Sequence, residues 1–300
     1  MHLTLPVWSK YLFFTALLGL LLTSCNKFEG DQMVPSYLSI DTIKFTSDNL
    51  TQGSSTHKIT DSWVYVNDQL VGVYELPARI PVLQHGIQNL EVRAGIKLNG
   101  ISSTRVPYPF YVPYTIDNFE FIEDSIRLVN PSTKYYSTTF FAWIEDFENA
   151  SLSLISTSHS DTNIYKTEPR NNPEALLSEF SAYSGKITLD QSHKAFELAS
   201  FKSYVLPRNG VPVFLELDYK CDIPFTVGMY ASENGTVVSI PLVVVNTSKN
   251  WNKIYINLGP NVAEHTQASD YRIFFQSDID TEEQANVLFD NIKLVYRINE

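Results

Sequence analysis

The stretch Val213-Phe214-Leu215-Glu216-Leu217-Asp218-Tyr219 has the two-residue period of a β-strand. Its odd-numbered residues are apolar or aromatic, whereas Glu216 and Asp218 alternate with them. One face of the strand is therefore predicted to pack into a core, and the other to carry carboxylates. An amphipathic helix would need apolar residues at every third or fourth position instead. The stretch predicts a protein built from β-sheets.

Strands of the same kind recur through the second half of the chain. The expected strands cover residues 152–155, 186–189, 195–198, 213–219, 225–230, 237–245, 253–258, 271–276, 287–289 and 292–296. About ten short strands over such a length are typical of a jelly-roll β-sandwich. We therefore expect residues 135–300 to form one large all-β domain.

A smaller β module is expected before it, over residues 35–130. Its predicted strands lie at 37–45, at 63–74 as a hairpin turning at Asn67-Asp68, at 79–83 and at 89–96. The turn-rich sequence Asn130-Pro131-Ser132-Thr133 marks the boundary between the two modules. The run from Tyr108 to Tyr114 sets two prolines among aromatic residues. It fits either a sugar-stacking platform, or an edge strand or packing between domains. The second interpretation is favoured because proline is confined to strand edges.

The N-terminus has the pattern of an export signal. Lys10 precedes a short apolar run that ends at Leu22, and a run of that length is too short to span a bilayer of about 30 Å as a helix. The following Leu22-Thr23-Ser24-Cys25 resembles the lipobox of bacterial lipoproteins. The resemblance implies cleavage after residue 24 and a diacylglyceryl group on the Cys25 thiol. The alternatives are an ordinary secretory signal with a coincidental cysteine, or an uncleaved anchor.

Residues 25–34 are a polar tether. Acyl chains on one cysteine hold a protein stably at a membrane, so the expected membrane partner is a bilayer reached through Cys25. Asn26 follows the cysteine, where an aspartate would resemble an inner-membrane retention signal. The chain therefore resembles an outer-membrane lipoprotein of the Bacteroidota type, facing either the periplasm or the cell surface.

Each β module also resembles a known family. Residues 62–115, with a strand, a hairpin and the strand around Asn89 to Ile96, resemble the PEGA-like surface module, a small immunoglobulin-like sandwich. In the second half, Asp146-Phe147-Glu148 and Phe289-Asp290-Asn291-Ile292-Lys293-Leu294 resemble the two ends of the carbohydrate-binding-module jelly roll, which is a galactose-binding-like fold. The resemblance implies an immunoglobulin-like spacer followed by a larger jelly-roll β-sandwich that binds glycan.

A ligand face follows from strand parity and from the resemblance. Aromatic rings stack on sugars, and carboxylate, guanidinium and amide groups bond their hydroxyls. The expected ligand-binding side chains are Glu216, Asp218, Tyr230, Tyr255, Arg272 and Gln276. The alternative is an ordinary solvated sheet face. We assign Trp251 to core or edge packing.

The same family resemblance implies a structural Ca²⁺ site. Its ligands would be Glu148 and Asp290, with Asp146 as a third, because hard oxygen ligands suit Ca²⁺. The alternative is that these acids cap turns at the sheet edge. No other cofactor is expected.

Charge and motifs restrict the function further. The chain has 22 Lys and Arg against 33 Asp and Glu, a formal net charge of −11, which argues against nucleic acid as a partner. The sequence contains no nucleophile elbow, zinc-protease motif or phosphate loop. Glu216 and Asp218 match two acids of a jelly-roll glycosidase motif, but Cys221 occupies the position of the third. No catalytic residue is therefore assigned.

These observations favour a non-catalytic, lipid-anchored envelope protein that binds polysaccharide through its second module. The first alternative is a structural or assembly lipoprotein that binds a protein partner at the cell surface. The second is an atypical glycoside hydrolase.

Overall fold

The computed structural model describes Trp8 and residues 33–167, 174–178, 181–208, 210–280 and 284–298. The expected signal peptide, apart from Trp8, and the tether up to residue 32, with Cys25, lie outside the described residues. In the part of the chain that is described, no helix is long and apolar enough to cross a membrane.

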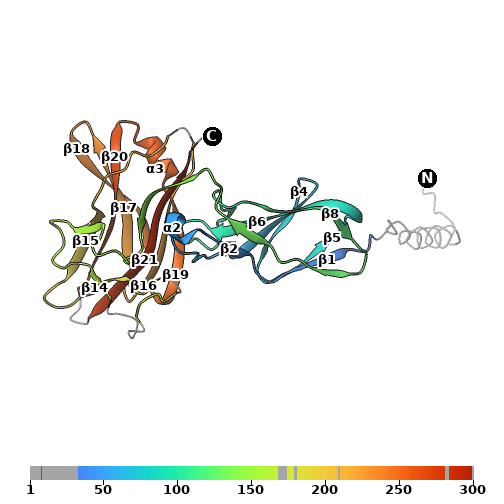
Figure 1. The fold of residues 1–300 in the computed structure, drawn as a ribbon, viewed down its shortest axis with the longest axis horizontal. Coiled ribbons are helices and arrows are strands. Elements are labelled where there is room, and N and C mark those ends of the chain that lie inside the picture. The colour runs from blue at the N-terminus through green and yellow to red at the C-terminus, as the bar shows by residue number, and fades with distance from the viewer. Residues whose placement is uncertain are drawn as a thin grey trace, which may run out of the picture.

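Two β modules are joined end to end (Figure 1). The strands of the first module and of its connection to the second are β1 (Ser36–Ile40), β2 (Lys44–Thr46), β3 (Asp61–Val66), β4 (Gln69–Glu75), β5 (Ala78–Val82), β6 (Gly86–Lys97), β7 (Arg105–Pro107), β8 (Tyr114–Phe121), β9 (Ile126–Leu128) and β10 (Ser132–Lys134). Those of the second are β11 (Thr139–Glu145), β12 (Leu154–Ser156), β13 (Tyr165–Lys166), β14 (Gly185–Leu189), β15 (Ala195–Ser200), β16 (Val213–Cys221), β17 (Phe225–Glu233), β18 (Thr236–Val245), β19 (Ser248–Asn257), β20 (Ala268–Asp278) and β21 (Ala285–Arg297). The described helices α2 (Asn49–Gln52) and α3 (Gly259–Glu264) are short turns.

The first module is a sandwich of two sheets. One has the order β5-β1-β9, and the other has the order β4-β3-β6-β7 with β8 also paired to β6. Apolar side chains of both sheets, such as Leu38, Ile80, Val64 and Val92, share one buried core. The expected hairpin is present between β3 and β4, and Asn67 and Asp68 at its turn both have positive φ, as type I′ turns require.

Two parallel strand pairs occur in the first module and in its connection to the second. β1 pairs in parallel with β9, and β2 pairs in parallel with β10 in a two-stranded sheet of its own. The single strand expected over residues 37–45 is therefore wrong in detail, because β1 ends at Ile40 and β2 begins at Lys44.

The second module is a larger β-sandwich. Its first sheet has the order β13-β14-β21-β16-β19, and β11 pairs with the C-terminal half of β21 on the same edge as β14. Its second sheet has the order β12-β15-β20-β17-β18. The prediction of an all-β chain of sandwich domains is confirmed. The two strands expected at 287–289 and 292–296 are one strand, β21. Asn291 takes a positive φ within it, so Asp290-Asn291 forms an irregularity in a continuous strand rather than a turn.

Strand β16 has the expected parity, but its polar face is not solvated. Leu215 and Leu217 belong to the core of the second module, as predicted. Phe214 on the opposite face instead joins the core of the first module, together with Tyr255 and Val295. Glu216 on that face is 0% exposed. The expectation of an open polar face is wrong, because the first module covers this part of the sheet.

Candidate functional site

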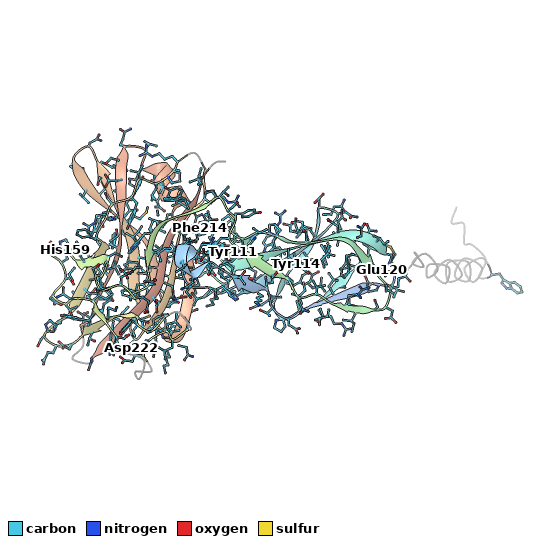
Figure 2. All side chains as sticks on the ribbon, in the orientation of Figure 1. Tyr111, Tyr114, Glu120, His159, Phe214 and Asp222 are labelled. Carbon is cyan, nitrogen blue, oxygen red and sulfur yellow. The ribbon has the colours of Figure 1, made fainter. Side chains whose placement is uncertain are left out.

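Aromatic residues of the first module pack directly on the sheet of the second. The Tyr108 ring lies 5.4 Å from that of Phe214 and 4.7 Å from that of Tyr255, measured between centroids. Figure 2 labels Tyr111 and Phe214 where the modules meet. Tyr108, Phe110 and Tyr111 are all buried. Of the two functions considered for the run from Tyr108 to Tyr114, the structure shows packing between domains for these three side chains.

A charged network lies within this interface. Glu216 accepts hydrogen bonds from the hydroxyls of Tyr108 and Tyr135, each at 2.8 Å to Oε1. The Lys253 ammonium lies 3.5 Å from Glu216 Oε2 and 3.5 Å from Asp218 Oδ1. Unpaired buried charges are costly, so partners on both sides of the interface are needed to hold Glu216 there.

Lys293 is the second cation of the network. Its side chain is 0% exposed, and its Nζ donates a 2.6 Å hydrogen bond to the carbonyl of Ser54 in the first module. Burial lowers the pKa of Lys293 to about 8, against the opposing effect of the Glu216 charge. Burial also raises the pKa of Tyr108 and Tyr135 well above the usual range, so both hydroxyls keep their protons and donate.

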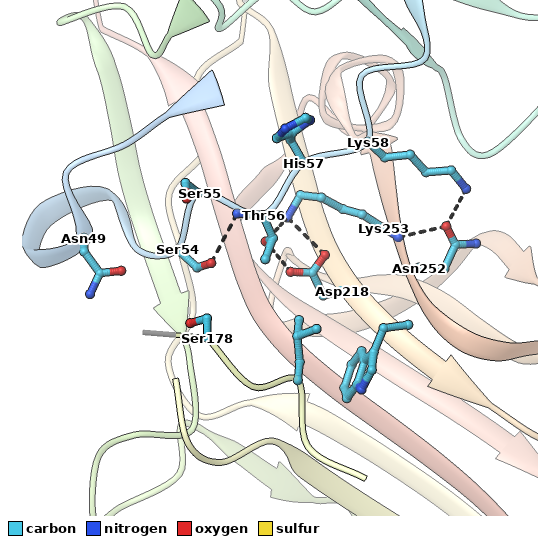
Figure 3. A pocket seen from close by; sticks show the side chains of 12 residues that line it. Asn49, Ser54, Ser55, Thr56, His57, Lys58, Ser178, Asp218, Asn252 and Lys253 are labelled. Carbon is cyan, nitrogen blue, oxygen red and sulfur yellow. Dashed lines mark hydrogen bonds and ion pairs between the residues drawn. The ribbon is translucent and has the colours of Figure 1, made fainter. Parts of the chain in front are cut away.

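The network opens into a cavity between the modules, which we call the junction cleft. Residues 54–58 of the first module form one wall, and Asp218, Trp251, Asn252 and Lys253 form the other. Asn49, Leu176 and Ser178 complete its lining, and its volume is about 660 Å³. Figure 3 shows the polar side chains of both walls turned toward one another.

Hydrogen bonds position the side chains of the cleft. Thr56 donates from its hydroxyl to Asp218 Oδ2, and Lys58 donates from Nζ to Asn252 Oδ1 (Figure 3). Asn252 is held in turn by the 2.9 Å bond from its Nδ2 to the Tyr219 hydroxyl. The Trp251 indole, half-buried, donates from Nε1 to the carbonyl of Glu174 at 3.1 Å. The cleft thus combines one partly exposed aromatic ring with hydrogen-bonding groups supplied by both modules.

The six expected ligand residues do not form one surface. Glu216 and Tyr255 are buried in the module interface, and Asp218 lines the junction cleft. Tyr230, Arg272 and Gln276 lie instead on β17 and β20 of the other sheet, where Tyr230 is paired with Arg272. The expectation that these three join the β16 face is wrong, because the two sheets are opposite layers of the sandwich.

The outer face of that other sheet has its own polar cluster. Glu197 Oε1 accepts from the Thr157 hydroxyl at 2.6 Å and from the Tyr230 hydroxyl at 2.5 Å, and lies 3.1 Å from His159 Nδ1. The Phe274 ring lies 4.6 Å from that of Tyr230, and it occupies the space that a side chain at Gly228 would need. These side chains bond mainly to one another, so the cluster presents few free polar groups.

The acids expected to bind Ca²⁺ act as hydrogen-bond acceptors for nearby turns. Glu148 Oε1 accepts from the backbone amides of Ala182 and Tyr183 at 2.8 and 2.9 Å. Asp290 accepts from the Ser184 hydroxyl at 2.7 Å, and burial raises its pKa well above the usual range, which favours a neutral acid. Asp146 accepts from the amide of Glu148 at 3.2 Å.

Ca²⁺ takes six to eight oxygen ligands, mostly charged or carbonyl oxygens. Among the described residues, no three acidic, histidine or cysteine side chains are grouped so that they could hold a metal ion. In the described structure Asp146, Glu148 and Asp290 accept hydrogen bonds from nearby turns, which agrees with the alternative that they cap turns. The Ca²⁺ site stays a prediction of the sequence.

Sequence reasoning missed most of the junction cleft. Thr56, His57 and Lys58 lie between predicted strands of the first module, and no motif marks them. Trp251 was assigned to packing, yet it lines the cleft beside Asn252. The available signal was the aromatic–amide–cation order of Trp251-Asn252-Lys253 within β19, but the wall that faces it comes from the other module.

Comparisons with known proteins give structural neighbours only. No protein-family model and no curated protein matches this sequence. A structure described as carbohydrate-binding modules of the β-sandwich superfamily has 10% identity and a TM-score of 0.39, over 88% of this chain and 99% of that one. A xylan-binding domain of carbohydrate-binding module family 22 has 10% identity and a TM-score of 0.36, over 52% and 94%. The enzymatically active domain of bacteriophage CBA120 tailspike protein 4 has 11% identity and a TM-score of 0.34, over 54% and 20%.

The neighbours therefore include carbohydrate-binding modules together with an enzyme domain. At this degree of likeness they assign neither a family nor a ligand to the chain.

Proposed function

We propose that the chain is a non-catalytic, lipid-anchored cell-envelope protein that binds glycan in the junction cleft. The observation that carries the proposal is the meeting of the Trp251 ring with Asp218, Asn252 and Lys58 in one cavity of about 660 Å³. Sugars offer apolar C–H faces to aromatic rings and hydroxyls to carboxylate, amide and ammonium groups. The volume falls in the range of about 300–1,000 Å³ typical of small-ligand sites.

The carboxylates in and beside the cleft favour binding over hydrolysis. Asp218 is the one acid among the described residues that line the cavity. Glu216 on the same strand is fully buried, and Tyr108, Tyr135 and Lys253 already contact its oxygens. A glycosidase needs two carboxyls on opposite sides of the sugar bond. The pair on β16 does not provide them.

Anchoring and location rest on the sequence at Leu22 to Cys25. Lipid on Cys25 would hold the protein at the outer membrane, on its periplasmic face or at the cell surface. The described chain starts at the end of the first module that is farther from the second (Figure 1). An anchor joined there would keep the junction cleft away from the membrane and accessible to polysaccharide.

Affinity electrophoresis of the full-length protein through gels containing single polysaccharides tests glycan binding. We expect at least one polysaccharide to retard the protein, and the retardation to be lost in Trp251→Ala and Asp218→Asn. Tyr165→Ala is the matched control, because Tyr165 is 62% exposed on β13 and is not part of the cleft lining. Absence of retardation across a broad panel of neutral and acidic polysaccharides would exclude glycan binding.

One observation favours the alternative of a protein partner. β18 is an edge strand of the second sheet, and it exposes Val237 and Val244, at 69% and 62%. Exposed apolar edge strands pair with other chains. An envelope protein retained by immobilised full-length protein through β18, and released by Val237→Lys, would support this second function.

A further inference from the structure

The charges that line the junction cleft are not balanced. Lys253 has two carboxylate neighbours, Glu216 and Asp218, each at 3.5 Å. Lys58 has none within ion-pair distance among the described residues, and its Nζ donates to the neutral amide oxygen of Asn252. The cleft therefore presents one ammonium group whose charge no carboxylate of the described chain compensates.

This ammonium is held in place rather than free to swing away. The backbone amide of Lys58 donates to the Tyr255 hydroxyl at 2.9 Å, which ties the residue to the second module. Its acceptor Asn252 is itself fixed, because Asn252 Oδ1 also accepts from the amide of Lys253 at 2.9 Å. The Lys58 side chain is exposed and lines the cleft, where a ligand would meet it.

Two neighbouring cations act on the wall of the cleft that carries Lys58. The pKa of Lys58 is lowered by partial burial and by the positive charge of Lys97. The pKa of His57 is lowered by burial and by the charge of Lys253, against the opposing charge of Asp218. Burial is the larger cause of both shifts, and the cations Lys97 and Lys253 add to it. An anion paired with the Lys58 ammonium would compensate its charge, which no carboxylate of the described chain does.

We propose that the junction cleft recognises a sugar ring bearing an anionic group, with the Lys58 ammonium as the counter-charge and the Trp251 ring as the stacking surface. The inference rests on the proposed glycan binding and specifies its ligand class. The anionic group is either a uronic-acid carboxylate or a sulfate ester, since a lysine ammonium pairs with each as a point charge. Trp251, Asn252 and Lys58 all line the cleft, and Asn252 bonds to Lys58, so the ring surface and the cation belong to one cavity.

Matched pairs of polysaccharides test the charge requirement. Binding of the full-length protein in detergent is measured by calorimetry at 150 mM salt against polygalacturonate and its methyl ester, and against a sulfated galactan and its desulfated form. We expect an acidic polymer to bind at least tenfold more tightly than its neutral counterpart. Preferred binding of polygalacturonate identifies the anionic group as a carboxylate, and preferred binding of the sulfated galactan identifies it as a sulfate.

Variants at the same position assign the effect to Lys58. Lys58→Gln is expected to remove the preference for the acidic polymer, and Lys58→Arg to keep it. Lys249→Gln is the matched control, because Lys249 is an exposed lysine of β19 outside the cleft lining. An unchanged melting temperature in Lys58→Gln shows that the effect does not come from unfolding.

The outcomes separate this inference from the function on which it rests. Equal binding of acidic and neutral polymers, or an acidic preference that survives in Lys58→Gln, overturns the role of Lys58 and leaves glycan binding in place. Binding to neutral polysaccharides alone also overturns the role of Lys58 and leaves glycan binding in place. Failure to bind any polysaccharide overturns both proposals.

Discussion

The hydroxyl of Tyr108 in the first module donates a 2.8 Å hydrogen bond to Oε1 of Glu216 in the second, and both side chains are buried. The two modules are therefore joined by a specific polar contact as well as by apolar packing. The sequence predicts Glu216 to be a ligand-binding residue, but in the structure it is buried in the interface beside the junction cleft.

Removal of the Tyr108 hydroxyl is expected to destabilise the protein. In Tyr108→Phe, Glu216 keeps its bonds from Tyr135 and its contact with Lys253 but loses one donor. Hydrogen bonds to charged groups contribute about 1.5–3 kcal/mol, so the free energy of unfolding should fall by about that amount. Urea denaturation of the variant measures it, with Tyr114→Phe as a control because Tyr114 is only half-buried. Equal unfolding midpoints for Tyr108→Phe and the parent protein would show that the bond is not stabilising.

Lys293 is expected to make stability rise with pH above about 8. Its folded-state pKa of about 8 lies below the usual 10.5, so between these values the unfolded chain binds more protons than the folded one. Stability then increases as pH rises through this window, by up to about 1.4 kcal/mol per pH unit. Below pH 8 both states hold the proton, so the cost of burying the charge is fully present there.

The difference between the parent protein and Lys293→Met isolates this contribution. We expect the gap in unfolding free energy between the two proteins to change between pH 8 and 10, to the advantage of the parent. Above pH 10 the raised pKa values of Tyr108 and Tyr135 act in the opposite direction, because the unfolded chain then loses phenolic protons first. Parallel stability curves across pH 8–10 would contradict the assignment to Lys293.

Lipid attachment is expected to depend on Cys25. Cells producing the parent chain should incorporate labelled palmitate into it and retain it in the membrane fraction. Cys25→Ala should abolish the label and release the protein, whereas Cys221→Ala should do neither, because Cys221 is buried in the second module. Label that persists in Cys25→Ala would exclude the lipobox as the signal.

The sequence predicted strands well because their signal is local. The strand at Val213 to Tyr219 was predicted from the alternation of apolar and polar side chains alone. The structure confirms that Leu215 and Leu217 face the core of the second module. The turn at Asn67-Asp68 was also predictable, since few residues adopt positive φ at two consecutive positions. In both places a few adjacent residues decide the conformation.

The candidate site was not predictable in the same way. Glu216 and Asp218 show the same alternation whether their face meets water or another module. The tyrosine hydroxyls that cover this face come from residues distant in the chain, such as Tyr135, which lies more than 80 positions from Glu216. Lys58 and Trp251 likewise become one site only through the docking of the two modules.

The parallel pairing of β1 with β9 has a mechanical consequence for a tethered protein. A pull on the start of β1, opposed by a load held in the second module, slides the two strands past each other along their length. All hydrogen bonds of the pair then carry the force together, whereas peeling a hairpin apart breaks its bonds in turn. The β2 and β10 pair continues the same geometry up to the second module. The first module is thus suited to bear tension between its start and the second module, as the proposed anchor and glycan would apply it.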